Sequence, residues 1–212
     1  MAFGYPVSLE VSDRVAIVIG TVAVALGKAD GLIEAGARVT VVAQGPQDRL
    51  DSLAAQGVQV LARGYEPGDL EGAFVCVASD PDPGVRTTIA SEARERHVLL
   101  NMIDDVPNSD WAAPAIVKRG DLVLAISTGG RSPSLARRLR EELEEIFGTE
   151  WEEALDILEA ARSETLPMLP KFDERAARWS EALDTEELIV LVREGRGTEA
   201  KDRLVQRLVG SR

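Results

Sequence analysis

A glycine-bearing turn near the start of the chain has the residue types of a nucleotide phosphate site. An apolar run ending at Ile19 is followed by Gly20, Thr21, Val22, Ala23 and Val24. In the G-x-G-x-x-G/A pattern, the first glycine makes the turn, the second lets a pyrophosphate approach, and the third position allows close packing. Gly20 and Ala25 match the first and third positions, whereas Val22 places an isopropyl group at the second. Two interpretations stay open: a dinucleotide site, or a Rossmann pocket that is disabled or used differently.

A second loop carries hydroxyls, glycines and an arginine directly before an expected helix. Its residues are Ser127, Thr128, Gly129, Gly130, Arg131 and Ser132, followed by Pro133. A serine cap followed by proline at the first helical position is typical of a helix start. Hydroxyls, free backbone N–H groups and the positive end of a helix together favour a bound anion. The sequence therefore predicts an anion site in this loop.

The charge of the chain is uneven. The formal net charge of −12 argues against nucleic acid and against an anionic membrane surface as partners. Basic residues gather around the second loop, at Lys118, Arg119, Arg131, Arg137, Arg138 and Arg140. They predict a local patch for an anionic ligand. The alternative is that the last three arginines pair with Glu141, Glu142, Glu144 and Glu145 on a solvated helix face.

Cysteine and histidine are too scarce for a permanent transition-metal site, so we expect no bound metal. Cys76 is the single cysteine and lies in an apolar run, which predicts a buried thiol. His97 is the single histidine and is expected to be a surface or packing residue. The longest apolar stretch is too short to span a bilayer, and the N-terminus lacks the pattern of a signal peptide. We expect a cytoplasmic protein with no membrane partner.

Apolar runs alternate with helical segments through residue 103. The predicted strands are Arg14–Ile19, Arg38–Ala43, Val58–Ala62, Ala73–Ala78 and Val98–Ile103, with helices near Val22–Ala35, Gln47–Ala55 and Val85–Arg96. Strands rich in Val, Ile and Leu, without strict alternation, are typical of a parallel sheet covered on both faces. The fold class predicted is α/β, a Rossmann-type doubly wound parallel sheet over residues 1–113.

The pattern changes after this point. Ala115–Lys118 and Leu122–Ser127 predict two strands, and Leu135, Leu139 and Leu143 form the apolar stripe of a long helix that starts at Ser132 and Pro133. Thr149 with Glu152, and Asp184 with Glu187, have the spacing of capping boxes. We expect a small α+β region at 114–148 and a helical C-terminal domain at 149–212.

Several segments resemble the precorrin-2 dehydrogenase/sirohydrochlorin ferrochelatase family, over nearly the whole chain. They are YPVSLEVSDRVAIVIG, VALGK, EAGARVTVVA, NMIDD, PAIVKRGDLVLAISTGGRSPSLARRLRE and LPKFDERAARWSEAL. The resemblance implies an NAD-binding Rossmann domain at 1–113, a dimerisation region at 114–148 and a helical domain at 149–212, assembled as a homodimer. The activity it implies is NAD-dependent oxidation of precorrin-2 to sirohydrochlorin in siroheme biosynthesis. In many members Fe²⁺ is then inserted as a substrate.

The resemblance also assigns roles to residues. Asp104 matches the family's key aspartate and follows the last strand of the sheet, where a carboxylate can act as general base; the alternative is a loop carboxylate or helix cap. We expect NAD at Gly20, Thr21, Val22, Ala23, Val24, Gln44, Gly45, Ser79 and Asp80. We expect the anionic tetrapyrrole at Ser127, Thr128, Gly129, Gly130, Arg131 and Ser132.

The departures from the family pattern fall on the cofactor side. Gly-Gly-Gly is replaced by Gly20-Thr21-Val22, and Arg-Lys by Gly27-Lys28. No acidic residue follows the second strand, and Arg86 lies near the position of a family asparagine. These changes motivate an alternative, a chelatase with weakened or lost dehydrogenase activity. A third hypothesis is a non-catalytic nucleotide-sensing module, against which the retained Asp104 and STGGRSP segments count.

Overall fold

The computed structural model describes residues 4–20, 23–45 and 47–210 of the chain. They divide into two compact units, Met1–Ala113 and Pro114–Arg212. Thr21 and Val22, in the predicted phosphate turn, lie outside the described residues. Within the described part of the chain, no helix is long and apolar enough to cross a membrane.

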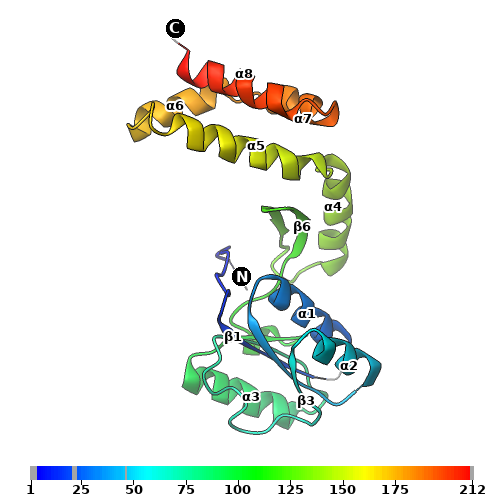
Figure 1. Cartoon of the computed structure of the whole chain (residues 1–212). Coiled ribbons are helices and arrows are strands. Elements are labelled where there is room, and N and C mark those ends of the chain that lie inside the picture. Colours follow the sequence, from blue (N-terminus) through cyan, green and yellow to red (C-terminus); the bar gives the residue numbers. More distant parts are fainter. Residues whose placement is uncertain (1–3, 21–22, 46, 211–212) are drawn as a thin grey trace. The chain divides into compact units, whose positions relative to one another are not determined.

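The first unit is built on a five-stranded sheet with the order β3-β2-β1-β4-β5 (Figure 1). The strands are β1 (Val15–Ile19), β2 (Arg38–Val42), β3 (Gln59–Leu61), β4 (Val75–Ala78) and β5 (Leu99–Met102). Every neighbouring pair runs parallel. The predicted Rossmann-type doubly wound fold is therefore confirmed. Each strand is one or two residues shorter than its predicted range, at one end or at both, because apolar residues also flank the paired segments.

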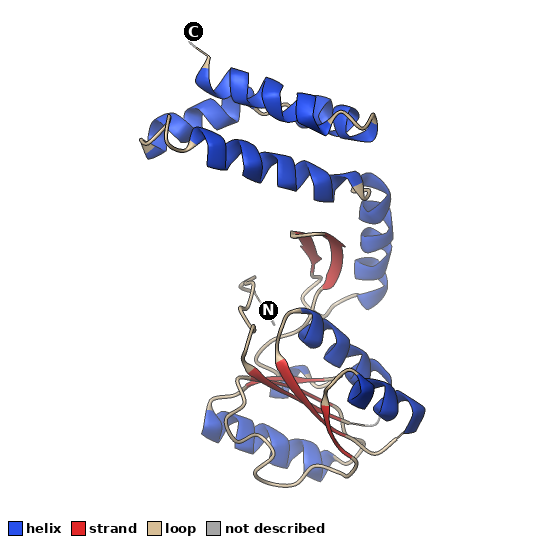
Figure 2. Cartoon of the chain, in the orientation of Figure 1, coloured by secondary structure: helices blue, strands red, loops and turns tan. Residues whose placement is uncertain are grey.

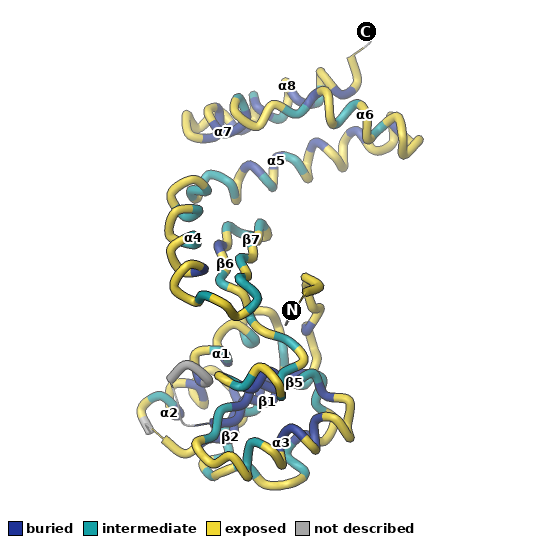
Figure 3. The backbone as a smooth tube through the Cα atoms, turned by 180° about the vertical axis from the view of Figure 1, so that it is seen from behind, coloured by how far each residue is buried: buried dark blue, intermediate teal, exposed yellow. Residues whose placement is uncertain are grey.

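Helices cover both faces of this sheet, as Figure 2 shows. The helices α1 (Ala23–Glu34) and α2 (Gln47–Ala55) pack on one face through Leu26 and Leu53. On the other face, α3 (Pro83–Arg96) packs through Ile89. Because both faces are covered, β1 is buried at consecutive positions and runs through the buried interior of the unit (Figure 3).

The ends of α3 follow from local hydrogen bonding. The Asp82 side chain accepts a hydrogen bond from the Gly84 N–H at 2.7 Å, and Pro83 takes the first turn. This cap starts the helix two residues before the predicted Val85. His97 ends it with a φ of +56°, the left-handed conformation common at helix ends.

Two side chains are buried at the sheet and α3. Cys76 is 0% exposed, as predicted, and burial raises the pKa of its thiol. Glu92 is 8% exposed and accepts hydrogen bonds from the Tyr65 hydroxyl and from the Gly68 N–H at 3.0 Å, with Arg96 Nε at 2.7 Å. Burial by itself raises the pKa of Glu92, but these hydrogen bonds outweigh it and hold the pKa below its usual range. Glu92 thus ties the segment before β4 to α3.

The second unit begins with an antiparallel hairpin and a helix. The strands β6 (Ala115–Arg119) and β7 (Leu122–Ile126) join at Gly120, whose φ is +56°, and α4 spans Pro133–Ile146. Arg119 donates hydrogen bonds to the Phe147 carbonyl at 2.7 Å and the Glu144 carbonyl at 3.2 Å. This guanidinium therefore caps the last turn of α4 and fixes the hairpin to it. The predicted stripe on α4 is only partly covered: Leu135 is 49% exposed.

Four helices complete this unit and confirm the predicted helical C-terminal part. They are α5 (Glu150–Thr165), α6 (Phe172–Ala182), α7 (Thr185–Arg193) and α8 (Gly197–Val209). Asp184 caps α7 as predicted, accepting from the Glu187 N–H at 3.0 Å. The predicted box at Thr149 and Glu152 is wrong, because Thr149 already has helical φ and ψ and its hydroxyl makes no capping bond. A side-chain cap needs an extended residue at that position.

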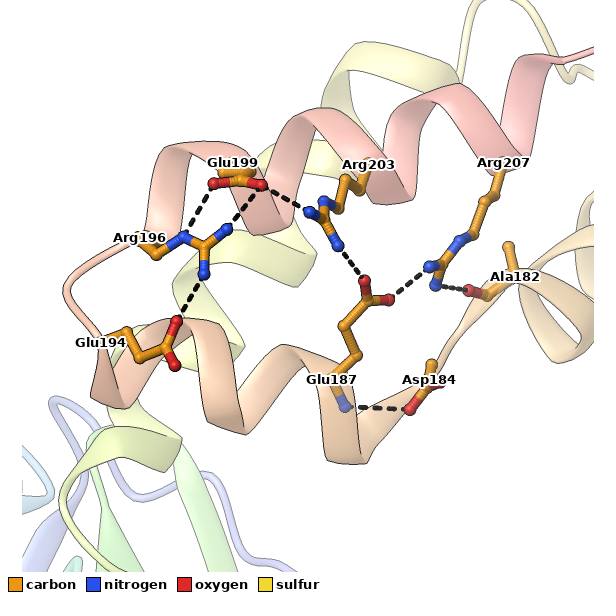
Figure 4. Close-up of polar contacts among 8 residues, drawn as sticks. All are labelled: Ala182, Asp184, Glu187, Glu194, Arg196, Glu199, Arg203 and Arg207. Atoms are coloured by element: carbon orange, nitrogen blue, oxygen red, sulfur yellow. Dashed lines mark hydrogen bonds and ion pairs between the residues drawn. The ribbon is translucent and has the colours of Figure 1, made fainter.

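An ion-pair network joins α7 and α8 (Figure 4). The Glu187 carboxylate accepts hydrogen bonds from Arg203, at 2.6 Å, and from Arg207. These two hydrogen bonds lower the pKa of Glu187. Glu187 was predicted to complete a capping box at Asp184, but its side chain points to α8 instead.

Candidate active site

The carboxyl ends of three strands meet at one edge of the sheet in the first unit. Ile19, at the end of β1, pairs with Ala78 of β4, which pairs with Met102 of β5. The ladder continues one residue further: the Ser79 N–H donates to the Ile19 carbonyl at 2.8 Å, and the Ile103 N–H to the Ala78 carbonyl at 2.8 Å. The strand order reverses between β1 and β4. This is the switch point at which open α/β sheets bind ligands.

Gly20 lies at this switch point in a conformation that requires glycine. Its φ is +138°, and a Cβ placed on it would lie 2.3 Å from the Ser79 carbonyl oxygen. The first fingerprint position therefore packs directly against the loop after β4. Helix α1 begins at Ala23, followed by Val24, so a helix N-terminus lies three residues after Gly20 in the sequence. These features fit a dinucleotide phosphate, which is held by a tight glycine turn and a helix N-terminus.

A pocket of about 370 Å³ opens beside this point, between the loops after β4 and β5. Its lining residues are Ser79, Asp80, Pro81, Arg86, Ile103, Asp104 and Asp105. The structure thus brings together three residues that the sequence singled out: Asp104, predicted as the base, and Ser79 and Asp80, predicted at the cofactor. Gln44 and Gly45 follow β2 at the same edge and are exposed, but they do not line this pocket.

Asp104 occupies a tight turn at the end of β5. The Asp105 N–H donates to the Met102 carbonyl at 3.1 Å, and Asp104, the third residue of the turn, has a φ of +60°. Among non-glycine residues, Asp and Asn adopt this region most readily. The side chain of Asp104 is exposed on the pocket wall and makes no hydrogen bond to a described residue. Its carboxylate therefore faces the pocket without a hydrogen-bond donor from the described part of the protein.

The neighbouring Asp105 has a different environment. One carboxylate oxygen, Oδ2, accepts a hydrogen bond from the Asn108 amide at 2.9 Å and lies 3.9 Å from Arg86 Nε. Its backbone carbonyl accepts from the Ser109 hydroxyl at 2.9 Å. Asp105 is thus held by the protein, whereas Asp104 faces the pocket. This difference separates two adjacent carboxylates that the sequence alone could not tell apart by environment.

The loop after β4 is organised by its own side chains. Asp80 Oδ1 accepts a hydrogen bond from the Asp82 N–H at 2.8 Å. Arg86 Nη1 donates to the carbonyls of Asp80, at 2.7 Å, and Pro81, at 3.2 Å. The sequence marked Arg86 only as a departure from a family pattern. Arg86 lies one turn into α3, directly after a loop that contains prolines. From this position a long side chain can reach back to the loop, and this is the sequence signal that could have predicted the contact.

The predicted anion loop lies in the second unit. Gly129 and Gly130 have φ of +61° and +76°. Thr128 Oγ1 accepts from the Ser132 N–H at 3.1 Å, Ser127 Oγ accepts from the Gly129 N–H at 3.2 Å, and Ser132 Oγ caps α4 at the Leu135 N–H. The three hydroxyls therefore shape the loop. Arg131 is exposed, and its guanidinium has no partner among the described residues.

The predicted basic patch is smaller than its composition suggested. Arg138 pairs with Glu142 and Arg140 with Glu144, both at 2.9 Å, and Arg119 caps α4. These three arginines serve the helix, because the i, i+4 spacing brings opposite charges together and carbonyls at a helix end attract cations. Among the patch arginines in the described chain, Arg131 and Arg137 remain exposed without an ion pair.

Groups of three or more His, Cys, Asp or Glu side chains that could hold a metal ion do not occur among the described residues. The candidate site is a pocket lined by Asp80, Asp104 and Asp105 at the carboxyl edge of the parallel sheet. The fold and the place of this pocket define the class of Rossmann-type α/β proteins.

Comparison with known proteins narrows the class. Residues 7–115, more than half of the chain, match the family described as "Putative NAD(P)-binding", and residues 119–146 match "Sirohaem biosynthesis protein central". The chain is 31% identical over 204 residues to "Siroheme synthase 1" of Serratia proteamaculans and 34% identical over 205 residues to "Siroheme synthase 1" of Pectobacterium atrosepticum. Each alignment covers 96% of this chain, which spans 43% and 42% of the length of these relatives.

A solved structure matches over almost its whole length. "SirC, precorrin-2 dehydrogenase" superposes with a TM-score of 0.74 at 26% identity, covering 94% of this chain and 98% of that one. The chain belongs to the NAD(P)-binding siroheme-biosynthesis family, in which a Rossmann domain precedes the sirohaem central region. The resemblance inferred from the sequence is confirmed.

Proposed function

We propose that this chain carries out the NAD-dependent oxidation of precorrin-2 to sirohydrochlorin. The observation that carries the proposal is the exposed Asp104 carboxylate in a pocket beside Gly20, at the switch point of the sheet. The printed name of the structural neighbour, a precorrin-2 dehydrogenase of nearly the same extent, supports this activity. The longer siroheme synthases support the same biosynthetic direction.

In this reaction the macrocycle loses a hydride and a proton. NAD⁺ supplies the hydride acceptor, so precorrin-2 and NAD⁺ give sirohydrochlorin, NADH and a proton. Asp104 takes the proton as general base, which a carboxylate with no protein donor bound to it can do. Gly20, Thr21, Val22, Ala23 and Val24 would hold the phosphates of the cofactor, as the fingerprint pattern predicts. Gln44, Gly45, Ser79 and Asp80 contact the rest of the cofactor.

The substrate part of the proposal concerns the second unit. Precorrin-2 is a polycarboxylate, and Ser127–Ser132 with the exposed Arg131 would bind its anionic edge. The N-terminus of α4 and the exposed Arg131 guanidinium favour an anion there. Local binding of this kind offsets the negative net charge of the chain.

We also propose that the chain acts as a homodimer through residues 114–148. Large apolar side chains are exposed on β6, β7 and α4, namely Ile116 at 47%, Val123 at 52%, Leu135 at 49% and Ile146 at 61%. Exposed apolar surface of this kind marks an interface more often than a free surface. The proposed parts are thus a Rossmann domain at 1–113, a dimerisation region at 114–148 and a helical domain at 149–212, in a cytoplasmic enzyme.

The decisive experiment follows precorrin-2 oxidation and NADH formation under anaerobic conditions. We expect Asp104→Asn to abolish turnover while leaving NAD⁺ affinity by calorimetry unchanged. Glu95→Gln is the matched control, because it removes an exposed carboxylate on α3 outside the pocket. Full turnover in Asp104→Asn would refute the base assignment. Failure of the wild-type chain to bind NAD⁺ would refute the dehydrogenase.

The chelatase alternative is not favoured, since the relatives found include a dehydrogenase that matches nearly the entire chain. Gly27 is one of the two residues that motivated this alternative. It is an ordinary helical position at which an added Cβ meets nothing within 4 Å. Val22, the other, lies outside the described residues. Insertion of Fe²⁺, as a substrate, into sirohydrochlorin is measured in the same samples by loss of the free macrocycle's absorbance.

A further inference from the structure

Arg86 is the residue that connects the two walls of the pocket. Its Nη1 donates to the carbonyls of Asp80 and Pro81 in the loop after β4. Its Nε lies 3.9 Å from Oδ2 of Asp105 in the turn after β5. A guanidinium can bind several acceptors at once because its donors are fixed in one plane. One side chain on α3 thus touches both loops that carry the proposed site residues.

The contact with Asp105 matters because of where Asp105 sits. Asp105 closes the turn of Met102–Asp105 by its N–H, and the third residue of that turn is Asp104. Asp104 has a φ of +60°, which few residues adopt without support. Asp105 also accepts from Asn108, whose Oδ1 in turn accepts from Arg94 of α3 at 2.9 Å. Helix α3 therefore holds Asp105, the neighbour of Asp104, in two ways: directly through Arg86, and through Asn108, which Arg94 binds.

The Arg86–Asp105 pair differs from the surface ion pairs of the chain. Its side chains are 28% and 23% exposed, against 78% and 53% for Arg138 and Glu142. A sheltered pair is screened less by solvent and salt than an exposed one. Arg86 also holds two main-chain carbonyls, so its head group is fixed independently of Asp105. An ordinary surface ion pair would be more exposed, and its arginine would not also bind main-chain carbonyls.

We propose that Arg86 is a positioning residue for Asp104. It locks the loop after β4 to the turn after β5, so that the Asp104 carboxylate keeps one direction on the pocket wall. The guanidinium does not take part in proton transfer. The proposal rests on the proposed function for its catalytic consequence, but its structural part, an immobilised turn, can be measured without any activity.

The test compares Arg86→Gln, Arg86→Lys and the control Arg96→Gln in the full chain. Arg96 is on the same helix and pairs with Glu92 at 2.7 Å, away from the pocket. We expect Arg86→Gln to lower kcat for precorrin-2 oxidation by about tenfold to a hundredfold, the cost of a misplaced group. The KM for precorrin-2 should stay within about twofold, because the proposed substrate contacts lie in the loop Ser127–Ser132 and not at Arg86. Arg86→Lys should recover part of kcat, since it keeps the charge but not the fork.

The control separates positioning from general loss of stability. Arg96→Gln should lower the Tm while leaving kcat within about twofold, because its ion pair lies outside the pocket. A rise of KM with unchanged kcat in Arg86→Gln would overturn the proposal, since it would make Arg86 a substrate-binding residue. A weaker NAD⁺ Kd with unchanged kcat would also overturn it, since Arg86 would then act on cofactor binding and not on Asp104. An equal loss of kcat in Arg96→Gln would also overturn it.

Hydrogen exchange keeps the proposal testable if the chain oxidises no precorrin-2. The hydrogen-bonded backbone amides of Ile103 and Asp105 should exchange about tenfold faster in Arg86→Gln than in the wild-type chain, because local opening is easier. They should be unchanged in Arg96→Gln. Faster exchange without wild-type turnover refutes the proposed function and leaves the positioning role standing. Unchanged exchange refutes the positioning role, whatever the turnover.

Discussion

The Cα of Gly20 packs so closely against Ser79 that a Cβ on it would lie 2.3 Å from the Ser79 carbonyl oxygen. The carbonyl is part of the backbone directly after β4 and cannot move aside as a flexible side chain could. The first fingerprint glycine and the loop after β4 are therefore a single packed contact.

Gly20→Ala should destabilise the chain by about 2 kcal/mol or more, because it adds both a clash and a strained φ. Gly27→Ala is the matched control on α1, where an added Cβ meets nothing within 4 Å. It should stabilise by about 0.5–1 kcal/mol, since alanine favours a helix over glycine. Urea unfolding of both variants measures the difference. Equal effects would contradict the packing argument.

Substitutions at Asp104 should separate stability from activity. With a φ of +60°, the position favours glycine and asparagine over alanine. We expect Asp104→Ala to be about 1 kcal/mol less stable than Asp104→Gly, the cost of a left-handed residue with a Cβ. All charge-removing variants should lose precorrin-2 oxidation. Thermal unfolding and anaerobic assays on the same samples test this, and greater stability of Asp104→Ala would contradict the turn geometry.

The buried Glu92 makes part of the stability depend on acid pH. Its folded-state pKa is lowered, so its contribution is present above the unfolded pKa of about 4.3 and is lost as the pH falls through the folded value. Glu92→Gln should cost about 2 kcal/mol at neutral pH, because several donors lose a charged acceptor. The gap between the variant and the wild type should shrink as urea unfolding is repeated below about pH 4. A gap that grows on acidification would show the opposite sign.

The Glu187 network should respond to salt. Glu187 joins Arg203 and Arg207 across two helices, with its side chain 22% exposed (Figure 4). Glu187→Gln should lower the Tm, and the loss should diminish at about 1 M salt, where the Debye length is about 3 Å. A loss independent of salt would mean that packing, and not charge, holds the helices.

The dimer proposal predicts a difference between two equally exposed valines. Val123 on β7 is 52% exposed and Val190 on α7 is 50% exposed. Val123→Asp should yield monomers in sedimentation equilibrium, because a charge in an apolar interface loses its solvent. Val190→Asp should leave the assembly of the wild-type chain intact. A monomeric wild type, or dissociation in Val190→Asp alone, would refute the region 114–148 as the interface.

Local patterns predicted most of the fold. The run of Val and Ile in β1 and the caps at Ser132 and Asp184 each specify their own element, because the governing interactions lie within a few residues. The prediction of a cap at Thr149 was wrong because the backbone of Thr149 is already helical. This conformation depends on how α5 connects to α4 and not on the residue type.

The site was harder to predict from composition. The positive charges of Arg119, Arg138 and Arg140 suggested a ligand-binding patch. In the structure these side chains instead bind partners on α4, so they are not available to a ligand. The sequence showed Arg86 only as a departure from the family pattern and did not predict its contacts. Its acceptors, two backbone carbonyls and Asp105, come together only when β4 and β5 lie side by side. Asp104 and Asp105 are neighbours in sequence, and only the turn gives them different surroundings.

The single cysteine gives this protein a built-in reporter. Cys76 is fully buried in β4, between β1 and β5, and burial raises the pKa of its thiol, which keeps the thiol protonated and unreactive. A thiol-reactive dye therefore labels the chain only when the sheet opens. The labelling rate thus measures how often the sheet opens. Conversely, a cysteine introduced at an exposed position can carry a fluorophore or spin label selectively, with no native thiol to remove. Distances between the two units, and any change in them when nucleotide binds, thus become measurable by spectroscopy on an otherwise unaltered chain.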